Sequence, residues 1–240
     1  RMRLVGSEMC IRDRKNVMQF GHFTDRGLPN FNFRCPSWNP MPDGKKNVIV
    51  LGCSHTYGTG LNDNEHWVAH LSKHKQDKLR YWNIGMPGAS SDQIVRLLYG
   101  VEKLLDPKII IVCWPEWSRR ERLDQTTTSL TSDDRLLGHE TENTDKQNFL
   151  KNVFFVEKFA EKNNCTTFHC FAQTNYSQYI SKLNVLDTYT LANCWPYWDK
   201  FEQRTPYDKP SYAQDGVHYG VEHHERFAKL FVEYFKNKLR

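Results

Sequence analysis

A short apolar run that ends in a glycine and a serine constrains this chain more than any other stretch. Residues 47–60 read Asn-Val-Ile-Val-Leu-Gly-Cys-Ser-His-Thr-Tyr-Gly-Thr-Gly. The unbroken aliphatic run from Val48 to Leu51 is typical of a strand that is buried on both faces of a parallel sheet. Ligands of such open sheets bind beyond the carboxyl ends of the strands. Ser54 therefore lies where the nucleophile of an enzyme would lie.

Apolar strands and amphipathic helices alternate along the rest of the chain. This alternation favours an α/β protein, because right-handed crossovers place helices on both faces of a parallel sheet. We expect strands at 47–51, 81–84, 108–113 and 166–171, and a polar insertion or lid at 123–147. We expect helices at 65–73, at about 149–162 and at 221–238, and one that is capped by Ser90 or Ser91 and ends before Asp106. The inward face of the last helix is expected to hold Phe227, Ala228, Phe231, Tyr234 and Phe235. The sequence thus predicts an α/β fold, a three-layer α/β/α sandwich around a parallel sheet of about five strands.

Length and charge exclude several classes of protein. A chain of 240 residues suffices for one α/β domain with a well-filled core. No apolar stretch is long enough to cross a bilayer, which argues against an integral membrane protein. The net charge is +5, of which residues 1–14 supply +2, so +3 remains for the other residues. That charge is too small for a nucleic-acid surface, and acidic residues interleave with the cluster Arg119, Arg120 and Arg122.

Cysteine usage and the amino-terminal residues bear on the compartment. The seven cysteines form no C-x-x-C pair, and Cys53, Cys113 and Cys170 lie in or beside apolar runs, where free cysteines behave as small hydrophobes. No disulfide framework and no signal-peptide core are visible, which favours the cytoplasm for a sequence whose natural amino terminus is not established. Within residues 1–14, the stretch from Val5 to Arg14 resembles translated sequencing-adapter read-through. We expect residues 1–14 to be a non-native leader, followed by an extended lead-in at 15–46.

The base that Ser54 needs is best supplied by Asp215-Gly-Val-His218, just before the last helix. A serine hydroxyl is a poor nucleophile until an imidazole takes its proton and an acid orients that imidazole. Residues three apart share a face in a tight helical turn. Asp215 can then accept a hydrogen bond from one ring nitrogen of His218 while the other faces Ser54. The sequence predicts a catalytic triad of Ser54, Asp215 and His218.

Three motifs, in this order, resemble the blocks of the SGNH (GDSL-like) hydrolases. Gly52-Cys-Ser-His-Thr-Tyr-Gly58 is similar to the nucleophile block, Asn83-Ile-Gly-Met-Pro-Gly88 to the second block, and Asp215-x-x-His218 to the last. The resemblance covers residues 47–240. It implies one flavodoxin-like domain that hydrolyses esters through an acyl-serine intermediate, without a cofactor. It also implies that the backbone N–H groups of Ser54 and Gly88 stabilise the oxyanion, and a glycine suits this role because its amide can approach the reacting carbonyl closely.

The chain departs from that family pattern in two places. Cys53 replaces the aspartate that usually precedes the serine; that aspartate is not the triad acid, so the change should be tolerated. The third block, usually Gly-x-Asn-Asp, reads Cys113-Trp-Pro-Glu-Trp-Ser-Arg-Arg120 and lacks the asparagine that donates to the oxyanion. We expect Arg119 to substitute for it, since a cation stabilises a developing oxyanion. The alternative donors are Ser118 and the indole N–H groups of Trp114 and Trp117.

Several of these residues also have simpler structural interpretations. Ser54 can cap a helix, and Asp215 can form a turn before Gly216. His55 is expected to line the pocket entrance or to be exposed, and it is a weaker alternative base. Cys53 is an alternative nucleophile, which its place at the strand end disfavours.

Histidines and glutamates near His218 also invite a metal site. His218 and His224 are not at the i, i+4 spacing of a helical zinc pair, so we expect no metal. Glu222, His223 and Glu225 are expected to line a solvated face of the last helix.

The aromatic residues bear on the substrate. Flat aromatic faces suit stacking on sugar rings, although packing of a long loop explains an aromatic-rich run equally well. The candidate substrate contacts are His55, Trp114, Trp117, Trp195 and Trp198. We therefore predict a serine esterase acting on an acyl ester, with O-acetylated carbohydrate as the candidate substrate and no nucleic-acid or membrane partner. The alternative is a non-catalytic binding module on the same scaffold, which the missing asparagine favours.

Overall fold

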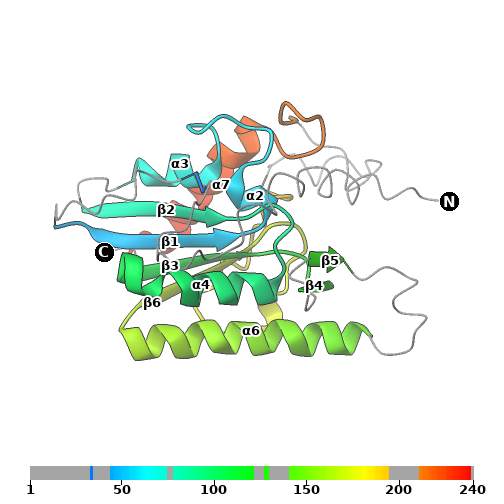
Figure 1. Ribbon diagram of the computed structural model, residues 1–240. Helices are drawn as coiled ribbons and strands as arrows, with labels where there is room; N and C mark the ends of the chain where they lie inside the picture. Colours follow the sequence, from blue (N-terminus) through cyan, green and yellow to red (C-terminus); the bar gives the residue numbers. More distant parts are fainter. Residues whose placement is uncertain are drawn as a thin grey trace, which may run out of the picture.

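A parallel four-stranded sheet lies at the centre of the protein (Figure 1). The computed structural model describes residues 33–34, 44–74, 78–121, 127–129, 141–194 and 211–238. The strands are β1 (Lys46–Gly52), β2 (Leu79–Gly85), β3 (Pro107–Trp114) and β6 (Thr166–Phe171). Their order is β2-β1-β3-β6, and every neighbouring pair is parallel. The sheet confirms the predicted α/β class, and all four expected strands are present.

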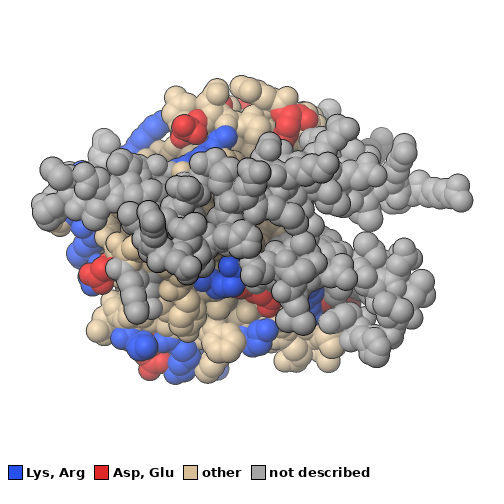
Figure 2. All heavy atoms as spheres, viewed as in Figure 1, with Lys and Arg blue, Asp and Glu red and all other residues tan. Residues whose placement is uncertain are grey.

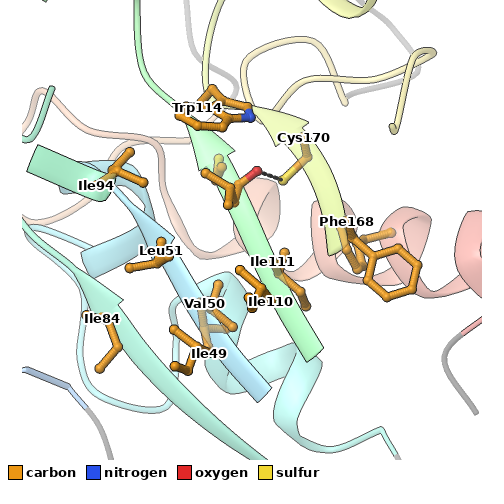
Figure 3. Packing of buried hydrophobic residues seen from close by; sticks show 14 of the residues in the cluster. Ile49, Val50, Leu51, Ile84, Ile94, Ile110, Ile111, Trp114, Phe168 and Cys170 are labelled. Atoms are coloured by element: carbon orange, nitrogen blue, oxygen red, sulfur yellow. Dashed lines mark hydrogen bonds between the residues drawn. The ribbon is translucent and has the colours of Figure 1, made fainter. Parts of the chain in front are cut away.

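The two central strands, β1 and β3, are apolar on both faces. Val48 to Leu51 and Ile109 to Trp114 are fully buried, so side chains of both strands pack against helices above and below the sheet. Figure 3 shows this core, in which Phe168 of β6 and Ile94 of the helix Ser91–Leu105 pack with the strands. The pairing aligns Gly52 with Gly85 and with Cys113. The loops that leave β1, β2 and β3 therefore start at one edge of the sheet.

Helices cover both faces of the sheet (Figure 1). On one face lie α3 (Trp67–Ser72) and α7 (Val221–Phe235), and on the other lie α4 (Ser91–Leu105) and α6 (Glu142–Asn163). Two short elements, α2 (Ser54–Tyr57) and a 3-10 turn at Ser177–Tyr179, complete the described helices. The three-layer α/β/α sandwich is thereby confirmed.

The outer edge of β6 carries a single bridge instead of a further strand. His169 pairs in parallel with Val185. The N–H of His169 donates to the carbonyl of Asn184 at 2.8 Å, and the N–H of Leu186 donates back to the carbonyl of His169 at 2.8 Å. The described part of the chain thus has four strands in the main sheet, against an expectation of about five, because residues 184–186 pair with β6 over only one residue.

The predicted polar insertion at 123–147 is partly regular structure. A short hairpin pairs β4 (Arg119–Glu121) with β5 (Thr127–Ser129), and α6 begins at Glu142, seven residues before the predicted start at 149. A capping box explains the earlier start: Thr144 N–H donates to Thr141 Oγ1 at 3.2 Å, and Thr141 N–H donates to Thr144 Oγ1 at 2.7 Å. A first turn of polar residues resembles a loop in sequence. Residues 1–32, including the expected leader, lie outside the described residues.

The last helix begins at its predicted residue and ends at Phe235, three residues before the predicted end at 238, and two of its residues lie on unexpected faces. His223 is fully buried rather than solvated, because it continues the apolar stripe one turn before Phe227. Tyr234 is 46% exposed rather than inward-facing, and its hydroxyl donates to Asp187 Oδ1 at 3.0 Å. Both predictions were wrong because the buried stripe repeats every four residues, from His223 through Phe227 and Phe231 to Phe235, and Tyr234 lies beside it.

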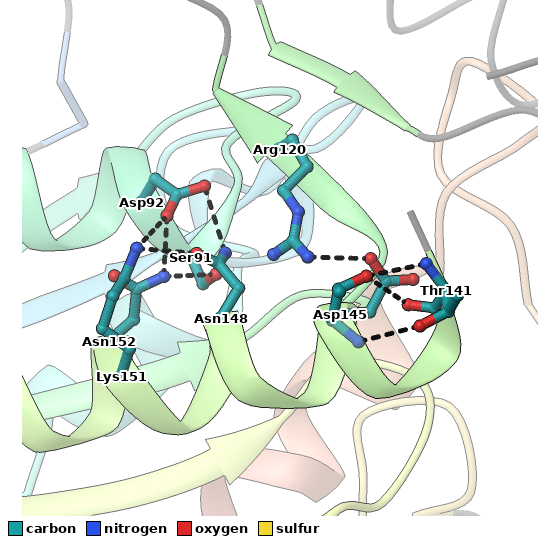
Figure 4. Close-up of polar contacts among 9 residues, drawn as sticks. Ser91, Asp92, Arg120, Thr141, Asp145, Asn148, Lys151 and Asn152 are labelled. Carbon is teal, nitrogen blue, oxygen red and sulfur yellow. Dashed lines mark hydrogen bonds and ion pairs between the residues drawn. The ribbon is translucent and has the colours of Figure 1, made fainter. Parts of the chain in front are cut away.

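A buried ion pair attaches the β4–β5 hairpin to α6 (Figure 4). Nη2 of Arg120 donates to Oδ1 of Asp145 at 3.0 Å, and the carboxylate of Asp145 is completely buried. Nearby, Asn152 of α6 donates to Ser91 Oγ and to Asp92 Oδ1, both at 2.9 Å. The amino end of α4 and the hairpin are thus both fixed to α6.

The Arg120→Met variant should lose about 3 kcal/mol of unfolding free energy, because it removes the cationic partner of a buried carboxylate. The exposed pair between Lys158 and Glu161, at 2.6 Å, offers the matched control. Lys158→Met should change the unfolding free energy far less, since exposed pairs contribute little. Urea titration of the two variants measures both changes, and equal losses would contradict the prediction.

The described surface on the face shown in Figure 2 is mixed in charge, with lysine and arginine side chains close to aspartate and glutamate side chains. None of the helices in the described part of the chain is both long enough and apolar enough to cross a membrane.

Candidate active site

Ser54 lies at the carboxyl end of β1, in the first turn of α2. The chain turns there because Gly52 has no side chain: a Cβ at this position would lie 2.9 Å from the carbonyl oxygen of Cys113 on β3 and 2.1 Å from Thr56 Oγ1. Ser54 is buried, at 1% exposure. As the first residue of a helix, it has a backbone N–H with no acceptor inside the helix. That N–H is therefore available to an anion at the end of the sheet.

A buried asparagine holds α2 onto β2. Nδ2 of Asn83 donates to the carbonyl of Thr56 at 2.9 Å, and Oδ1 of Asn83 accepts the N–H of Gly85 at 3.0 Å. In the sequence, Asn83 stands out only as part of the motif Asn83-Ile-Gly-Met-Pro-Gly88. The signal for its role was a polar side chain within an otherwise apolar strand, which has to be hydrogen-bonded when buried.

Gly85→Ala should disturb this contact. A Cβ at Gly85 would lie 2.4 Å from the backbone nitrogen of Tyr57 and 2.8 Å from the carbonyl carbon of Thr56, so α2 has to move. We expect a loss of about 1–3 kcal/mol of unfolding free energy. Gly44→Ala is the control: it meets no atom within 4 Å but has a positive φ of 73°. It should lose stability through backbone strain alone, as thermal unfolding of the two variants would show.

Asp215 and His218 form a tight pair, as predicted from their spacing. Oδ2 of Asp215 lies 2.6 Å from Nδ1 of His218, while Oδ1 accepts the backbone N–H groups of Val217 and His218, each at 2.9 Å. Burial raises the pKa of Asp215, but the hydrogen bonds from the His218 and Val217 backbones and from the His218 side chain outweigh it, so the pKa is lowered. The carboxylate is therefore charged at neutral pH. It fixes the proton on Nδ1 and leaves Nε2 as the acceptor.

The pair lies against the loop that carries Ser54. The ring of His55, which follows Ser54, meets the ring of His218 edge-on with centroids 5.3 Å apart. The N–H of Gln214 donates to the carbonyl of Gly60 at 2.9 Å. The residues expected to form the triad thus come from two segments that touch at one edge of the sheet. The hydrogen bond from Ser54 Oγ to Nε2 of His218 stays a prediction.

His55 is buried rather than exposed, and its place at the entrance of the substrate pocket stays a prediction. It is 6% exposed and lies between His218 and Tyr219, whose ring centroid is 5.2 Å away. Cys53 is also buried, at 1% exposure, and its carbonyl accepts the N–H groups of Thr56 and Tyr57. His55 and Cys53 thus pack inside the loop that carries Ser54.

Gly88 and Arg119 remain the candidate oxyanion donors besides Ser54. Gly88 has a positive φ of 78°, a conformation that favours glycine, and it precedes α4 by three residues. Nη1 of Arg119 is buried and donates to none of the described residues. Arg119 begins β4, which lies beside α4, and this nitrogen can still donate a hydrogen bond.

The predicted role of Trp114 as a substrate contact or oxyanion donor is wrong. Trp114 is fully buried, and its indole N–H donates to Nδ1 of His169 at 3.0 Å, while Nε2 of His169 donates to Glu157 at 2.9 Å. The position ends a central strand, so its side chain points into the helix layer. Trp117 is half-buried and stacks on Tyr176, with ring centroids 4.2 Å apart. Trp195 and Trp198 lie outside the described residues.

The third block is organised by an acid that the sequence did not single out. Glu116 accepts hydrogen bonds from Thr174 N at 3.0 Å, from Thr174 Oγ1 at 2.8 Å and from the hydroxyl of Tyr176 at 2.5 Å. It ties the loop after β3 to the loop after β6.

The histidines near His218 are not arranged as a metal site. His224 is buried, and its Nδ1 accepts the backbone N–H of Trp67 at 3.0 Å. Within the described ranges, no group of three or more histidine, cysteine, aspartate or glutamate side chains could hold a metal ion.

Solved structures share this fold across most of the chain. A protein described as lipolytic and of the G-D-S-L family, from Desulfitobacterium hafniense DCB-2, matches with a TM-score of 0.52 and 15% identity over 79% of this chain and 99% of its own. The psychrotrophic esterase EstA from Pseudoalteromonas sp. matches with a TM-score of 0.50 and 14% identity, over 81% of this chain and 99% of its own. A two-domain esterase active on acetylated mannans matches with a TM-score of 0.54 and 14% identity, over 81% of this chain and 50% of its own.

These similarities show that the chain has the fold of SGNH (GDSL-like) hydrolases. No protein-family model matches the sequence, and no curated protein matches it. At such low identity the structures establish the fold alone, so the activity has to follow from the residues at the site.

Proposed function

We propose that this chain is an SGNH-type serine esterase in which Ser54 is the nucleophile. The observation that carries the proposal is the Asp215–His218 pair, 2.6 Å between Oδ2 and Nδ1, lying against the loop of Ser54. A charged carboxylate on Nδ1 makes Nε2 a proton acceptor, which is what a serine needs to become nucleophilic.

The proposed reaction proceeds in two steps. Ser54 Oγ forms a bond to the acyl carbon and gives its proton to Nε2 of His218, which then protonates the departing alcohol oxygen as the ester C–O bond breaks. Water attacks the acyl-serine next, with the same nitrogen as the base, and releases the acid. Asp215 stays ionised throughout and stabilises the imidazolium that forms in each step.

Three N–H groups are the proposed oxyanion donors. The backbone amides of Ser54 and Gly88 are two of them, and Nη1 of Arg119 takes the place of the missing asparagine. Each donor of this kind typically stabilises the transition state by about 3 kcal/mol.

An acetylated carbohydrate is the proposed substrate class. One structural neighbour is an esterase active on acetylated mannans. In this chain, Trp117, Tyr176 and Tyr179 form an aromatic cluster just after β3 and β6, with Tyr179 at 37% exposure. Aromatic faces of this kind stack on sugar rings.

Covalent trapping tests the proposal. A fluorophosphonate should modify Ser54, as peptide mass spectrometry would show, and should abolish hydrolysis of p-nitrophenyl acetate. Hydrolysis that survives the fluorophosphonate but stops when Cys53 is alkylated would show that Cys53, and not Ser54, is the nucleophile. No labelling and no hydrolysis of several acyl esters would leave the binding-module alternative.

The substrate class is tested separately on acetylated manno-oligosaccharides. Acetate release with a higher kcat/KM than for p-nitrophenyl acetate is the expected result. A preference for the simple ester would remove the carbohydrate from the proposal and leave the esterase in place.

A further inference from the structure

Arg34 contacts the loop after Ser54 although it belongs to none of the strands and helices of the sandwich. Its Nη1 donates to the carbonyls of Gly58, at 2.9 Å, and Leu61, at 2.6 Å. Its Nε lies 3.5 Å from Oδ1 of Asp63, and its guanidinium lies 4.7 Å from the ring centroid of Tyr57. One side chain thus holds both ends of residues 58–61, which we call the glycine turn.

The glycine turn is attached to α2, the helix that begins at Ser54. The N–H of Gly58 donates to the carbonyl of Ser54 at 2.9 Å, and the N–H of Leu61 donates to the carbonyl of Gly58 at 3.1 Å. Gly58 and Gly60 both have positive φ, 81° and 77°. A turn with two such residues has few side-chain contacts of its own to keep it in place, so an external clamp matters more.

The same turn touches the proposed triad acid. The carbonyl of Gly60 accepts the N–H of Gln214 at 2.9 Å. A Cβ at Gly60 would lie 2.8 Å from Cγ of Asp215 and 2.9 Å from Cβ of Ala213. The backbone at Gly60 therefore forms one wall of the site in which the carboxylate of Asp215 sits.

We propose that Arg34 is a positioning residue: it holds the glycine turn, and the turn holds the carboxylate of Asp215 against His218. This inference rests on the proposed esterase function. An arginine suits the role because its planar guanidinium can donate to two carbonyls while it pairs with Asp63 and covers Tyr57. A lysine has one charged nitrogen and cannot keep all of these contacts.

Kinetics of three variants test the proposal. Arg34→Ala should lower kcat by about 10- to 100-fold with little change in KM, because the acid shifts while the substrate surface stays. Arg34→Lys should lie between Arg34→Ala and wild type. Added methylguanidinium should raise the kcat of Arg34→Ala. The matched control is Arg80→Ala, which removes a guanidinium 6.0 Å from the Trp82 ring centroid, near the amino end of β2. Its kcat should be unchanged, with or without methylguanidinium.

A nuclear magnetic resonance measurement separates this inference from the esterase proposal. The proton between Nδ1 of His218 and Asp215 should give a low-field resonance in wild type and in Arg80→Ala, and the resonance should weaken or move in Arg34→Ala. Wild type without activity would end the esterase proposal, and the resonance would still test Arg34. An Arg34→Ala variant with unchanged kcat and an unchanged resonance would overturn the inference. A kcat that falls only as far as thermal stability falls, and that methylguanidinium does not restore, would overturn it as well.

Discussion

Ser54→Ala should hydrolyse short acyl esters at least about 10³-fold more slowly than the wild-type chain. The substitution removes one oxygen atom, the proposed nucleophile, from a side chain that is 1% exposed. None of the described hydrogen bonds of the α2 backbone or of the Asp215–His218 pair involves that oxygen. The fold should therefore persist while the acyl-serine cannot form. Steady-state kinetics on p-nitrophenyl acetate, with thermal unfolding of the same samples, measures both effects.

Two further variants show whether Ser54 acts with His218. His218→Asn should be about as inactive as Ser54→Ala, and the double variant should be hardly worse than either, because members of a triad act as a unit. Cys53→Ala should keep activity, since the adjacent thiol is buried and plays no part in the proposed reaction. Equal hydrolysis by wild type and Ser54→Ala would end the serine mechanism.

Acid should destabilise the fold at a pH well above the pKa values of its carboxylates, because two buried histidines have to stay neutral in the folded chain. Burial lowers the pKa of His66 from 6.5 to about 4, with a smaller contribution from Arg34, and burial lowers the pKa of His224 well below 6.5. Nδ1 of His66 accepts the N–H of Ala69 at 3.1 Å, and Nδ1 of His224 accepts that of Trp67 at 3.0 Å. Protonation would replace each acceptor by a donor and break both contacts.

The sign of the pH dependence follows from proton uptake. Below pH 6.5 the unfolded chain binds protons on both histidines while the folded chain does not, so stability falls with pH. Each histidine contributes about 1.4 kcal/mol per pH unit, and His66 does so down to pH about 4. Above pH 6.5 this loss is absent. Asp215, whose pKa is lowered, adds a further loss only below its ordinary value of 3.8.

Urea unfolding between pH 4.5 and pH 7.5 measures this slope. His66→Asn keeps an oxygen that can cap α3 at Ala69 and should roughly halve the slope, whatever it does to stability at pH 7.5. The half-buried His70 is the control, and His70→Asn should change the slope much less. A slope that is the same in His66→Asn and wild type would show that His66 is not the titrating group.

Local patterns made most of the fold predictable. Aliphatic runs such as Ile109 to Val112 predicted the central strands. The spacing of Asp215 and His218 predicted that their side chains meet, and the two atoms lie 2.6 Å apart. Both follow from short-range geometry. The start of α6 was missed because a capping box of two threonines, Thr141 and Thr144, looks like a loop until its hydrogen bonds are seen.

The parts of the site that were missed depend on contacts between distant segments. Trp114 was expected to meet substrate, and only the structure shows that His169, 55 residues away, takes its indole N–H. Arg34 lies 27 residues before Leu61, and nothing in the intervening sequence marks the carbonyls that it binds. Tertiary hydrogen bonds of this kind leave no periodic signal in a sequence.

The single bridge between His169 and Val185 has a consequence for how the chain behaves among its own copies. The outer edge of β6 also receives N–H groups beyond that bridge: Leu191 donates to Phe171 at 3.1 Å, and Ala192 donates to Ala172 at 3.0 Å. An irregular segment thus occupies backbone groups that a free edge strand would offer to a neighbouring molecule. The strip at 184–192 protects this side of the sheet from intermolecular strand pairing without being a strand itself.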